Sequence, residues 1–480
     1  MRRAIPLAAA TALAAAAATA AALAWPSGCP SGTVIVPAGA SIQTYVNAAT
    51  PGAKFCLPRG TYRMQTVIAK PDQQFIGMPG AVLDGARLLR KFTHEGRFWV
   101  ASGQTQSKEL RGICRPGHET CIDGVELSID NHRLEQAAKR DEVTFGRFFF
   151  DHAAGKIYLV DDPIGKRVEV SAANYAFTGP ANGVVIRGLT VEHYYNTAQL
   201  GAINGAYTRG WRIENCDVRR NSGAGVTLGS DSQLVNSRLH DNGQIGASIS
   251  GSNILIAGND VWGNDTAGYD AGWEGGGIKV SGGKNVVFRG NRAHDNFGPG
   301  LWCDGDCDGV LFERNTASGN DGPGIFYEIS RNAVIRNNVL RENNHDHAPW
   351  FWGAEIQIAA SQNVDVYANS VTVAPGGRSI MLIDQNRPAG PNSYYQTRDN
   401  RVHDNTIVYL GTGAAGGVSD APPGSHNYAI IQNGNNRFFR NTYRYPADIP
   451  PVFVWGGEPG NFAAFRAHGQ ELDGSISAAR

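Results

Sequence analysis

The sequence predicts an all-β chain whose short strands stack as the coils of a parallel solenoid. Three observations lead to this prediction. A phrase of 21–24 residues recurs along the middle of the chain, its strands alternate apolar and polar residues without helical periodicity, and 60 of the 480 residues are glycine. A fixed period of this length indicates stacked units, and so much glycine favours a chain that turns often over a helical bundle.

The repeat runs from about residue 183 to residue 410, in phrases such as QLVNSRLHDN and VVFRGNRAHDN. Each unit closes on an asparagine, and the closing asparagines are Asn221, Asn242, Asn264, Asn296, Asn320 and Asn343. Their spacings are 21, 22, 32, 24 and 23 residues, so the third interval contains one unit and about ten inserted residues. In a solenoid, equivalent side chains stack ~4.8 Å apart, so inward Val, Ile and Leu form the core and corner asparagines stack as a ladder.

The composition excludes some classes of protein. The chain has 43 Lys and Arg residues against 43 Asp and Glu residues, and its net charge is zero. A general nucleic-acid-binding protein needs a basic face, so no nucleic-acid partner is expected. A hydrophobic content of 42% and a charged content of 18% are typical of a folded globular chain rather than a disordered one.

Residues 1–24 are expected to form a secretory signal peptide, because a basic start precedes an Ala-rich run and a small-residue cleavage site. A membrane anchor is the alternative, although a run composed mostly of alanine spans membranes poorly. We therefore expect a secreted or periplasmic protein that has no membrane association once the signal is removed.

The seven cysteines fit such a compartment, where disulfides persist. Their spacing suggests two close pairs, one wider pair and one remaining buried thiol, Cys216, although the sequence alone does not give the connectivity. The six cysteines expected in disulfides are, pair by pair, Cys29, Cys56, Cys114, Cys121, Cys303 and Cys307.

With these repeats the chain resembles the right-handed parallel β-helix superfamily, the pectin-lyase-like proteins, over about residues 35–90 and 170–440. The resemblance implies a right-handed parallel β-helix with an N-terminal capping helix, whose expected apolar face is Ile42, Tyr45, Val46 and Ala49. The segment that breaks the repeat contains the hairpin-like stretch GRFFFDHAAGKIYLVDDP and is expected to form a small inserted β module. The expected parts are the cap and first coil (25–91), the inserted module (92–172), the repeats (173–440) and a C-terminal tail or cap (441–480).

The second strands of successive units suggest where chemistry occurs. Aligning GGGIKVSG, GPGLWCDGD and GPGIFYEIS places Asp304 and Glu328 at the same outward position on neighbouring coils, so their Cβ atoms should lie ~5 Å apart. A pair of carboxyl groups ~5–5.5 Å apart suits glycoside hydrolysis with retention of configuration. Lys279 lies diagonally next to Asp304 and favours its ionised form, so Asp304 is the expected nucleophile. Apolar neighbours favour the protonated form of Glu328, which is the expected acid/base.

The same residues carry a narrower resemblance. The segment GLWCD, followed 24 residues later by FYEI, is similar to the β-helix retaining glycosidases that include β-xylosidases. The resemblance implies that Asp304 and Glu328 are the catalytic residues. The chain departs from that family at Cys303 and the following DGDCDG, and it lacks the polar stretch after the Glu, so reaction type is implied more strongly than substrate.

Two insertions, residues 265–277 and 345–355, leave the solenoid near this pair and carry aromatic and polar side chains suited to sugar binding. The expected substrate-binding residues are Lys279, Glu274, Trp273, Trp302, Phe326, His345, Trp352 and Glu355. No cofactor and no metal ligand is predicted. The D-x-D-x-D-G run beginning at Asp304 is a weak calcium alternative, because its twelfth position is Asn315 instead of glutamate.

These observations favour a secreted carbohydrate-active enzyme, a retaining glycoside hydrolase that acts on a polysaccharide or oligosaccharide. A polysaccharide lyase or uronate epimerase of the same fold, with Lys279 or an arginine as base, is a second hypothesis. A non-catalytic carbohydrate-binding protein is a third, since fold alone does not give function. The sugar, the linkage and the oligomeric state are not given by the sequence.

Overall fold

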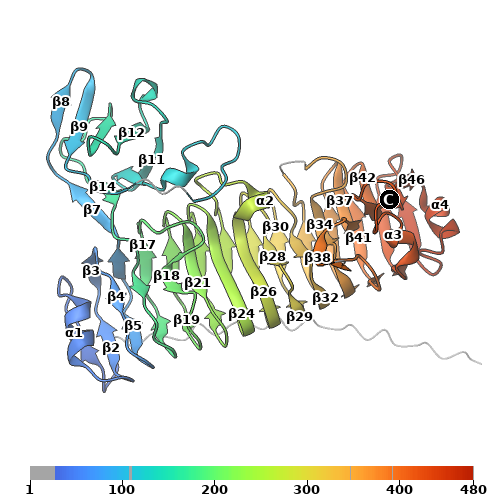
Figure 1. Ribbon diagram of the computed structural model, residues 1–480, viewed down its shortest axis with the longest axis horizontal. Helices are drawn as coiled ribbons and strands as arrows, with labels where there is room; N and C mark the ends of the chain where they lie inside the picture. The colour runs from blue at the N-terminus through green and yellow to red at the C-terminus, as the bar shows by residue number, and fades with distance from the viewer. Residues whose placement is uncertain (1–27, 108–110, 346–347, 392, 479–480) are drawn as a thin grey trace, which may run out of the picture.

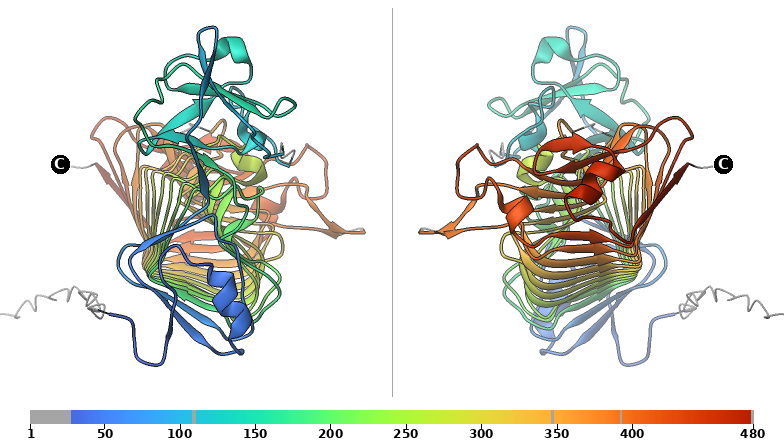
Figure 2. Two further views of the ribbon diagram at one scale, coloured as in Figure 1. Left: turned by 90° about the vertical axis from the view of Figure 1, so that its left-hand side faces the viewer. Right: turned by 90° about the vertical axis from the view of Figure 1, so that its right-hand side faces the viewer.

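The computed structural model describes residues 28–107, 111–345, 348–391 and 393–478. The signal peptide predicted for residues 1–24 therefore lies outside the described residues. The chain forms a right-handed parallel β-helix, and a small β module projects from its N-terminal half (Figure 1). Viewed along the axis, the coils superimpose and enclose one continuous core (Figure 2).

Each coil contributes strands to three faces, which we call the first, second and third face. The first face begins with β4 (Val67–Ile68). The second begins with β1 (Val34–Ile35) and β2 (Lys54–Leu57), followed by β5 (Gln74–Gly77), and the third begins with β3 (Gly60–Arg63), followed by β6 (Ala81–Asp84). The first face continues through β15 (Phe177–Thr178), β18 (Gly201–Gly205), β21 (Ala224–Leu228), β24 (Ile245–Ala257), β26 (Gly276–Arg289), β28 (Leu301–Asp304), β31 (Ile325–Glu328), β34 (Ala354–Ala359), β37 (Gly377–Asp384), β42 (Gly413–Ser419) and β45 (Val452–Trp455).

The second and third faces follow the same parallel pairing. The long strands β24 and β26 turn the corner and enter the second face, which also contains β16 (Val185–Arg187), β19 (Arg212–Glu214), β22 (Gln233–Val235), β29 (Asp308–Glu313), β32 (Arg331–Arg336), β35 (Gln362–Tyr367), β40 (Arg401–His403) and β43 (Arg437–Phe439). The third face contains β17 (Thr190–Glu192), β20 (Asp217–Arg219), β23 (Arg238–His240), β25 (Asp260–Trp262), β27 (Arg292–His294), β30 (Thr316–Ser318), β33 (Val339–Arg341), β36 (Ser370–Val373), β41 (Thr406–Tyr409), β44 (Thr442–Tyr445) and β47 (Ser475–Ala478).

Apolar side chains at equal positions of the coils stack inside the solenoid, as the alternation predicts. On the first face one such stack is in register from β21 to β37, and each member is at most 1% exposed: Val226, Ala247, Ile278, Leu301, Ile325, Ile356 and Ile380. A one-residue slip would turn this entire set outward, so burial of these residues fixes the register of the neighbouring outward positions as well.

The six closing asparagines form the predicted ladder at one corner. The side-chain oxygen of Asn242 accepts hydrogen bonds from the backbone N–H and the side-chain amide of Asn221, and the pattern repeats to Asn343. There the acceptor is a carboxylate: Glu355 accepts from both donors of Asn343. A second ladder runs from Asn259 to Asn441 at another corner, and its last acceptor is also a glutamate, Glu471.

The ends of the solenoid are covered. Helix α1 (Ile42–Ala48) packs at the N-terminal end, with Ser41 as its N-cap and Ile42 and Val46 buried, in agreement with the predicted capping helix. At the other end the chain does not form a separate tail. Residues 441–478 add strands β44, β45 and β47 to the last coils, and helix α4 (Phe462–Ala467) packs beside them.

The inserted module is a curled eight-stranded sheet that begins slightly earlier than residue 92. Its strands are β7 (Ala86–Leu89), β8 (Thr93–Glu95), β9 (Phe98–Ser102), β10 (Leu127–Ile129), β11 (His132–Gln136), β12 (Arg147–Asp151), β13 (Lys156–Leu159) and β14 (Val168–Ser171). Strands β12 and β13 form the predicted antiparallel hairpin. The module has its own apolar core, distinct from that of the solenoid.

The cysteines pair as their spacing suggests, in the disulfides Cys29–Cys56, Cys114–Cys121 and Cys303–Cys307. Cys216 is a buried free thiol. Disulfides of this number are typical of proteins that fold outside the reducing cytosol. In the described part of the chain, no helix has the length and apolar character needed to cross a membrane.

Candidate functional site

The predicted catalytic pair lies at the ends of two neighbouring strands of the first face. Residues 301–303 of β28 pair in order with residues 325–327 of β31, so the next residue of each strand, Asp304 and Glu328, comes level on adjacent coils. Because Cys303 and Tyr327 are fully buried in the core, the alternation of the strand turns both carboxyl groups outward.

Asp304 has a positively charged partner. The ammonium group of Lys279, one coil earlier on β26, lies 2.9 Å from Asp304 Oδ2. The same group lies 3.7 Å from the centre of the Trp302 ring, a cation–π contact that orients the lysine. The other oxygen, Asp304 Oδ1, is shielded from solvent and has no hydrogen-bond partner among the described residues. Lys279 therefore holds one oxygen of the carboxylate, and no described residue binds the other.

Glu328 has a raised pKa. The pKa is raised to about 7: burial is the largest cause, the negative charge of Asp304 acts in the same direction, and the cations Arg387 and Lys279 oppose both effects. The side chain of Glu328 is 12% exposed, so the group is sheltered but accessible. A carboxyl group with this pKa can exchange a proton near neutral pH, which is what a general acid requires.

Arg387 is a site residue that the sequence analysis missed. Its Nη1 lies 3.1 Å from Glu328 Oε1, and 44% of its side chain is exposed. It belongs to an excursion between β37 and β40 that carries the short strands β38 (Pro388–Gly390) and β39 (Ser393–Tyr394) and extends away from the solenoid (Figure 2). The excursion lies outside the repeat, so no periodicity signals that it returns to the catalytic pair.

Glu274 contacts the same lysine as Asp304. It lies within the first insertion, on helix α2 (Ala271–Glu274), and is 4% exposed. Its oxygens accept hydrogen bonds from Ser248 Oγ at 2.8 Å and Gln199 Nε2 at 2.9 Å, and one lies 3.8 Å from Lys279 Nζ. These contacts are those of a residue that holds the lysine, and the predicted contact of Glu274 with substrate stays a prediction.

The inserted module reaches this network. Arg111 donates to Gln199 Oε1 at 3.0 Å, while Gln199 donates to Glu274. The same module loop pairs with the first insertion through an isolated bridge between Cys114 and Tyr269. An unbroken series of polar contacts thus connects the module to Lys279 and Asp304.

The predicted aromatic residues form a wall, most of which is covered. Trp302 and Phe326 stack with ring centres 5.3 Å apart and are 3% and 8% exposed. They belong to an apolar cluster on the outer side of the first face, against which Phe351 and Trp352 of the second insertion pack. Trp302 Nε1 is buried without a hydrogen-bond partner among the described residues, so this wall has one free donor.

The remaining predicted binding residues have different positions. Trp273 is half-buried and stacks on Tyr269, with ring centres 5.7 Å apart. His345 is exposed at a coil corner next to Gly319. Glu355 was wrongly predicted to bind substrate: it is 1% exposed and both of its oxygens are bound to Asn343 at the end of the asparagine ladder.

The D-x-D-x-D-G run does not converge as a calcium loop does. Cys303 and Cys307 within it are joined by a disulfide, and its three carboxylates pair with cationic side chains. Asp304 pairs with Lys279, whereas Asp306 and Asp308 both pair with Arg331, at 3.8 and 3.1 Å. These contacts do not favour the calcium alternative.

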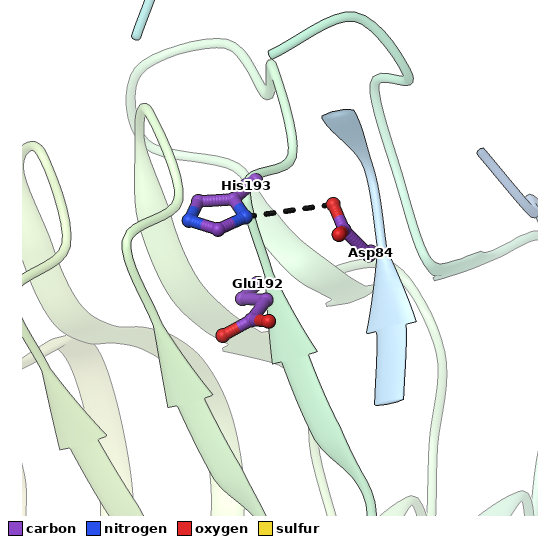
Figure 3. A group of neighbouring side chains, drawn as sticks. All are labelled: Asp84, Glu192 and His193. Atoms are coloured by element: carbon purple, nitrogen blue, oxygen red, sulfur yellow. Dashed lines mark ion pairs between the residues drawn. The ribbon is translucent and has the colours of Figure 1, made fainter. Parts of the chain in front are cut away.

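A second group of ionisable residues lies where the module joins the solenoid (Figure 3). Asp84, Glu192 and His193 have side-chain atoms close enough to share an ion. However, Asp84 pairs with Arg63 at 2.9 Å and Glu192 with Arg219 at 2.8 Å, so each carboxylate already has a cation. Burial lowers the pKa of His193, but the neighbouring carboxylates outweigh burial and the pKa is raised. Because both carboxylates already have cationic partners, these contacts favour a structural role.

Comparisons with known proteins agree with the fold. Residues 201–371, which include both strands of the catalytic pair, match the family model described as the right handed beta helix region. That segment carries the β-helix signature in sequence as well as in structure. A search of curated proteins finds no match to the chain.

Two solved structures are similar over most of their length. One is the complex of XylC with xylose, with 13% sequence identity, a TM-score of 0.66, and coverage of 91% of this chain and 82% of that chain. The other is the A-module of the Azotobacter vinelandii mannuronan C-5 epimerase AlgE4, with 14% identity, a TM-score of 0.52, and coverage of 91% and 94%. At these identities the likeness establishes the fold and leaves the chemistry to be argued from the site.

Proposed function

We propose that this protein is a secreted or periplasmic retaining glycoside hydrolase in which Asp304 is the nucleophile and Glu328 the acid/base. The observation that carries the proposal is the pair itself. Two carboxyl groups on adjacent coils have opposite environments, one bound to the Lys279 ammonium and the other with a pKa raised to about 7. Pairs of carboxyl groups that differ in this way divide the roles of nucleophile and acid.

In the first step, protonated Glu328 donates its proton to the glycosidic oxygen while Asp304 Oδ1 attacks the anomeric carbon. The bond between that carbon and the glycosidic oxygen breaks, the leaving group departs as an alcohol, and the sugar remains as an ester of Asp304. Lys279 favours this step because its ammonium group binds Asp304 Oδ2 and orients the carboxylate.

In the second step, the Glu328 carboxylate removes a proton from a water molecule, whose oxygen attacks the anomeric carbon. The ester bond to Asp304 breaks and the sugar leaves with the configuration it had in the substrate. Arg387 stabilises Glu328 while it is ionised in this half of the cycle, since its guanidinium contacts the same carboxylate.

The similarity to the XylC structure supports a choice of first substrate, because that protein is described in complex with xylose. The experiment uses nitrophenyl glycosides, beginning with the xyloside, and the variants Asp304→Ala and Glu328→Ala. We expect both variants to lose turnover and azide to restore it with different products, a glycosyl azide of inverted configuration for Asp304→Ala and one of retained configuration for Glu328→Ala. Wild-type activity on any of these glycosides that survives in both variants contradicts the proposal.

A uronate epimerase or lyase is the second candidate, and one observation favours it. Arg387 and Lys279 flank the pair, and a half-exposed guanidinium can bind the carboxylate of a uronate. Incubation with polymannuronate and polygalacturonate separates the candidates: unsaturated product or epimerised residues support the second candidate, and their absence together with glycoside hydrolysis supports the first.

A further inference from the structure

A pocket with a volume of about 370 Å³ lies at the junction of the inserted module and the solenoid, separate from Asp304 and Glu328. One side is formed by the module loop 117–126 and by strands β11 and β12. The other side is formed by Ser222, which follows the ladder residue Asn221, and by Thr266 and Ala267 of the first insertion. Its volume is within the range typical of small-molecule sites, ~300–1,000 Å³.

Two polar atoms of residues lining the pocket, Arg147 Nε and Ser222 Oγ, are buried and have no hydrogen-bond partner among the described residues. A third buried atom, Glu126 Oε1, makes no hydrogen bond and has only an ion pair with Arg133 at 3.3 Å. Glu126 is 8% exposed and Ser222 is 2% exposed. Buried polar atoms are nearly always paired in folded proteins, so two unpaired atoms and one weakly paired atom around one pocket point to a ligand or to ordered solvent.

The kinds of atom restrict the ligand. Glu126 offers an acceptor, Arg147 a donor, and the Ser222 hydroxyl can do both. A metal ion requires electron-pair donors only and is repelled by guanidinium groups, whereas a sugar hydroxyl both donates and accepts.

The charge balance argues against an acidic ligand. Arg133 pairs with Glu126 at 3.3 Å and Arg147 with Glu135 at 3.2 Å, so the two lining guanidinium groups are already neutralised. Two further carboxylates, those of Glu119 and Glu142, also line the pocket. The excess of negative charge disfavours uronates, sulfates and phosphates and leaves neutral polyhydroxylated molecules as the best match.

The walls also provide apolar surface and a fixed shape. Val125 and Leu134 line the pocket between the polar groups and can contact the C–H faces of a sugar ring. The loop that forms one wall is held by the disulfide Cys114–Cys121. A site with a fixed shape loses less conformational entropy on binding.

We propose that this pocket is a second carbohydrate-binding site, which takes a neutral sugar residue of the glycan away from the catalytic pair. The choice of a glycan as ligand rests on the proposed function. A site at this junction would hold the polymer to the enzyme between turnovers, and it would give the inserted module a role in substrate capture.

The test measures binding in a background without turnover. The parent protein carries Glu328→Gln, and the pocket variants add Ser222→Ala or Glu126→Gln, which change few atoms; Arg90→Ala, an exposed module residue outside the pocket, is the matched control. Isothermal titration calorimetry uses the β-linked tetrasaccharides of xylose, glucose, mannose and galactose, with a galacturonate tetrasaccharide as the acidic counterpart.

We expect at least one neutral tetrasaccharide to bind, with a dissociation constant that rises tenfold or more in either pocket variant and stays unchanged in the control. The galacturonate should bind more weakly than that sugar. The proposal is overturned if no neutral tetrasaccharide binds, or if both pocket variants bind all of them as the parent does. Equal circular dichroism spectra and melting temperatures of the parent and the variants exclude misfolding. Failure of the proposed function would appear separately, because the unmodified protein would then hydrolyse none of the glycosides.

Discussion

Two buried glutamates, Glu328 of β31 and Glu355 of β34, lie on neighbouring strands. Both have a raised pKa, but the groups that their carboxyl oxygens contact differ. Burial is the largest cause of the raised pKa of both, to about 7 for Glu328 and about 8 for Glu355. Glu355 points both oxygens at the donors of Asn343 and is 1% exposed. Glu328 instead faces a second carboxyl group and a half-exposed arginine.

A raised pKa therefore does not by itself identify a catalytic carboxyl group. The groups that contact the carboxyl oxygens decide its role. The oxygens of Glu355 are both occupied by the scaffold, whereas Glu328 contacts Arg387 through one oxygen and is close enough to Asp304 for its charge to raise the Glu328 pKa. A carboxyl group needs a free oxygen and access to substrate in order to move a proton.

The largest expected effect is a fall in kcat when Glu328, but not Glu355, loses its carboxyl group. Glu328→Gln should lower kcat by about 10²- to 10⁴-fold, the usual contribution of a general acid, because glutamine cannot donate a proton to the glycosidic oxygen. Glu355→Gln should leave kcat within a few-fold of wild type. Steady-state kinetics on a nitrophenyl glycoside measures both, and equal losses in the two variants would remove the distinction between the two glutamates.

Lys279→Met should lower kcat by about 10²-fold, because it removes the ammonium group that binds and orients Asp304. The control is Lys284→Met on the same strand, where the lysine is exposed on the far side of the corner. The same kinetic assay measures both variants. If the two lysine variants behave alike, the contact of Lys279 with Asp304 does not contribute to catalysis.

Glu355→Gln should instead affect folding. The amide places a donor against the donors of Asn343 and leaves one of them unpaired, which should lower the free energy of unfolding by about 1–3 kcal/mol. The folded pKa of Glu355 is above its ordinary value of 4.5, so wild type loses stability as pH rises from there to about 8 and the gap between the two proteins should narrow. Urea unfolding at several pH values measures this gap, with exposed Glu458→Gln, which does not influence Glu355, as a control that should match wild type. A gap that widens with pH would show that the ladder favours the ionised carboxylate.

The smallest effect is a shift in the pH profile. Glu328 must be protonated to act as the acid, so kcat/KM of wild type should fall as pH rises through about 7. Arg387 lowers the pKa of Glu328, so Arg387→Gln should move this alkaline limb to higher pH. Arg401→Gln, which removes an exposed ion pair with Asp365 on the second face, should leave the limb in place. A shift toward lower pH in Arg387→Gln contradicts the assignment.

The periodicity of the sequence predicts the positions of the site residues that lie within the repeat, but not of those outside it. The repeat and the alternation within it predict the register of β28 and β31, and therefore the level positions of Asp304 and Glu328 and the diagonal position of Lys279. Arg387 and Gln199 lie in segments that leave the repeat, where only the folded chain determines what they contact. The sequence places Glu355 at the end of the insertion 345–355, which is why it is predicted to bind substrate. In the structure it occupies the place where the next ladder asparagine would stand.

The contacts between the inserted module and the solenoid are equally hard to predict from the sequence. Its hairpin is recognisable from the sequence, but the contact of Arg111 with Gln199 and the pocket next to Ser222 depend on how the module docks. Docking contacts join residues far apart in the chain with no repeated spacing, so they leave no pattern in a single sequence.

The asparagine ladders have a direction that matters for protein engineering. Each ladder amide donates one hydrogen bond to the side chain of the next coil toward the C-terminus and another to a backbone carbonyl of an earlier coil, and a carboxylate receives the final pair from the last asparagine. A designer who wished to lengthen or shorten this molecule would therefore have to splice whole repeats, from one ladder asparagine to the next, and keep each terminal glutamate on the last rung of its own ladder.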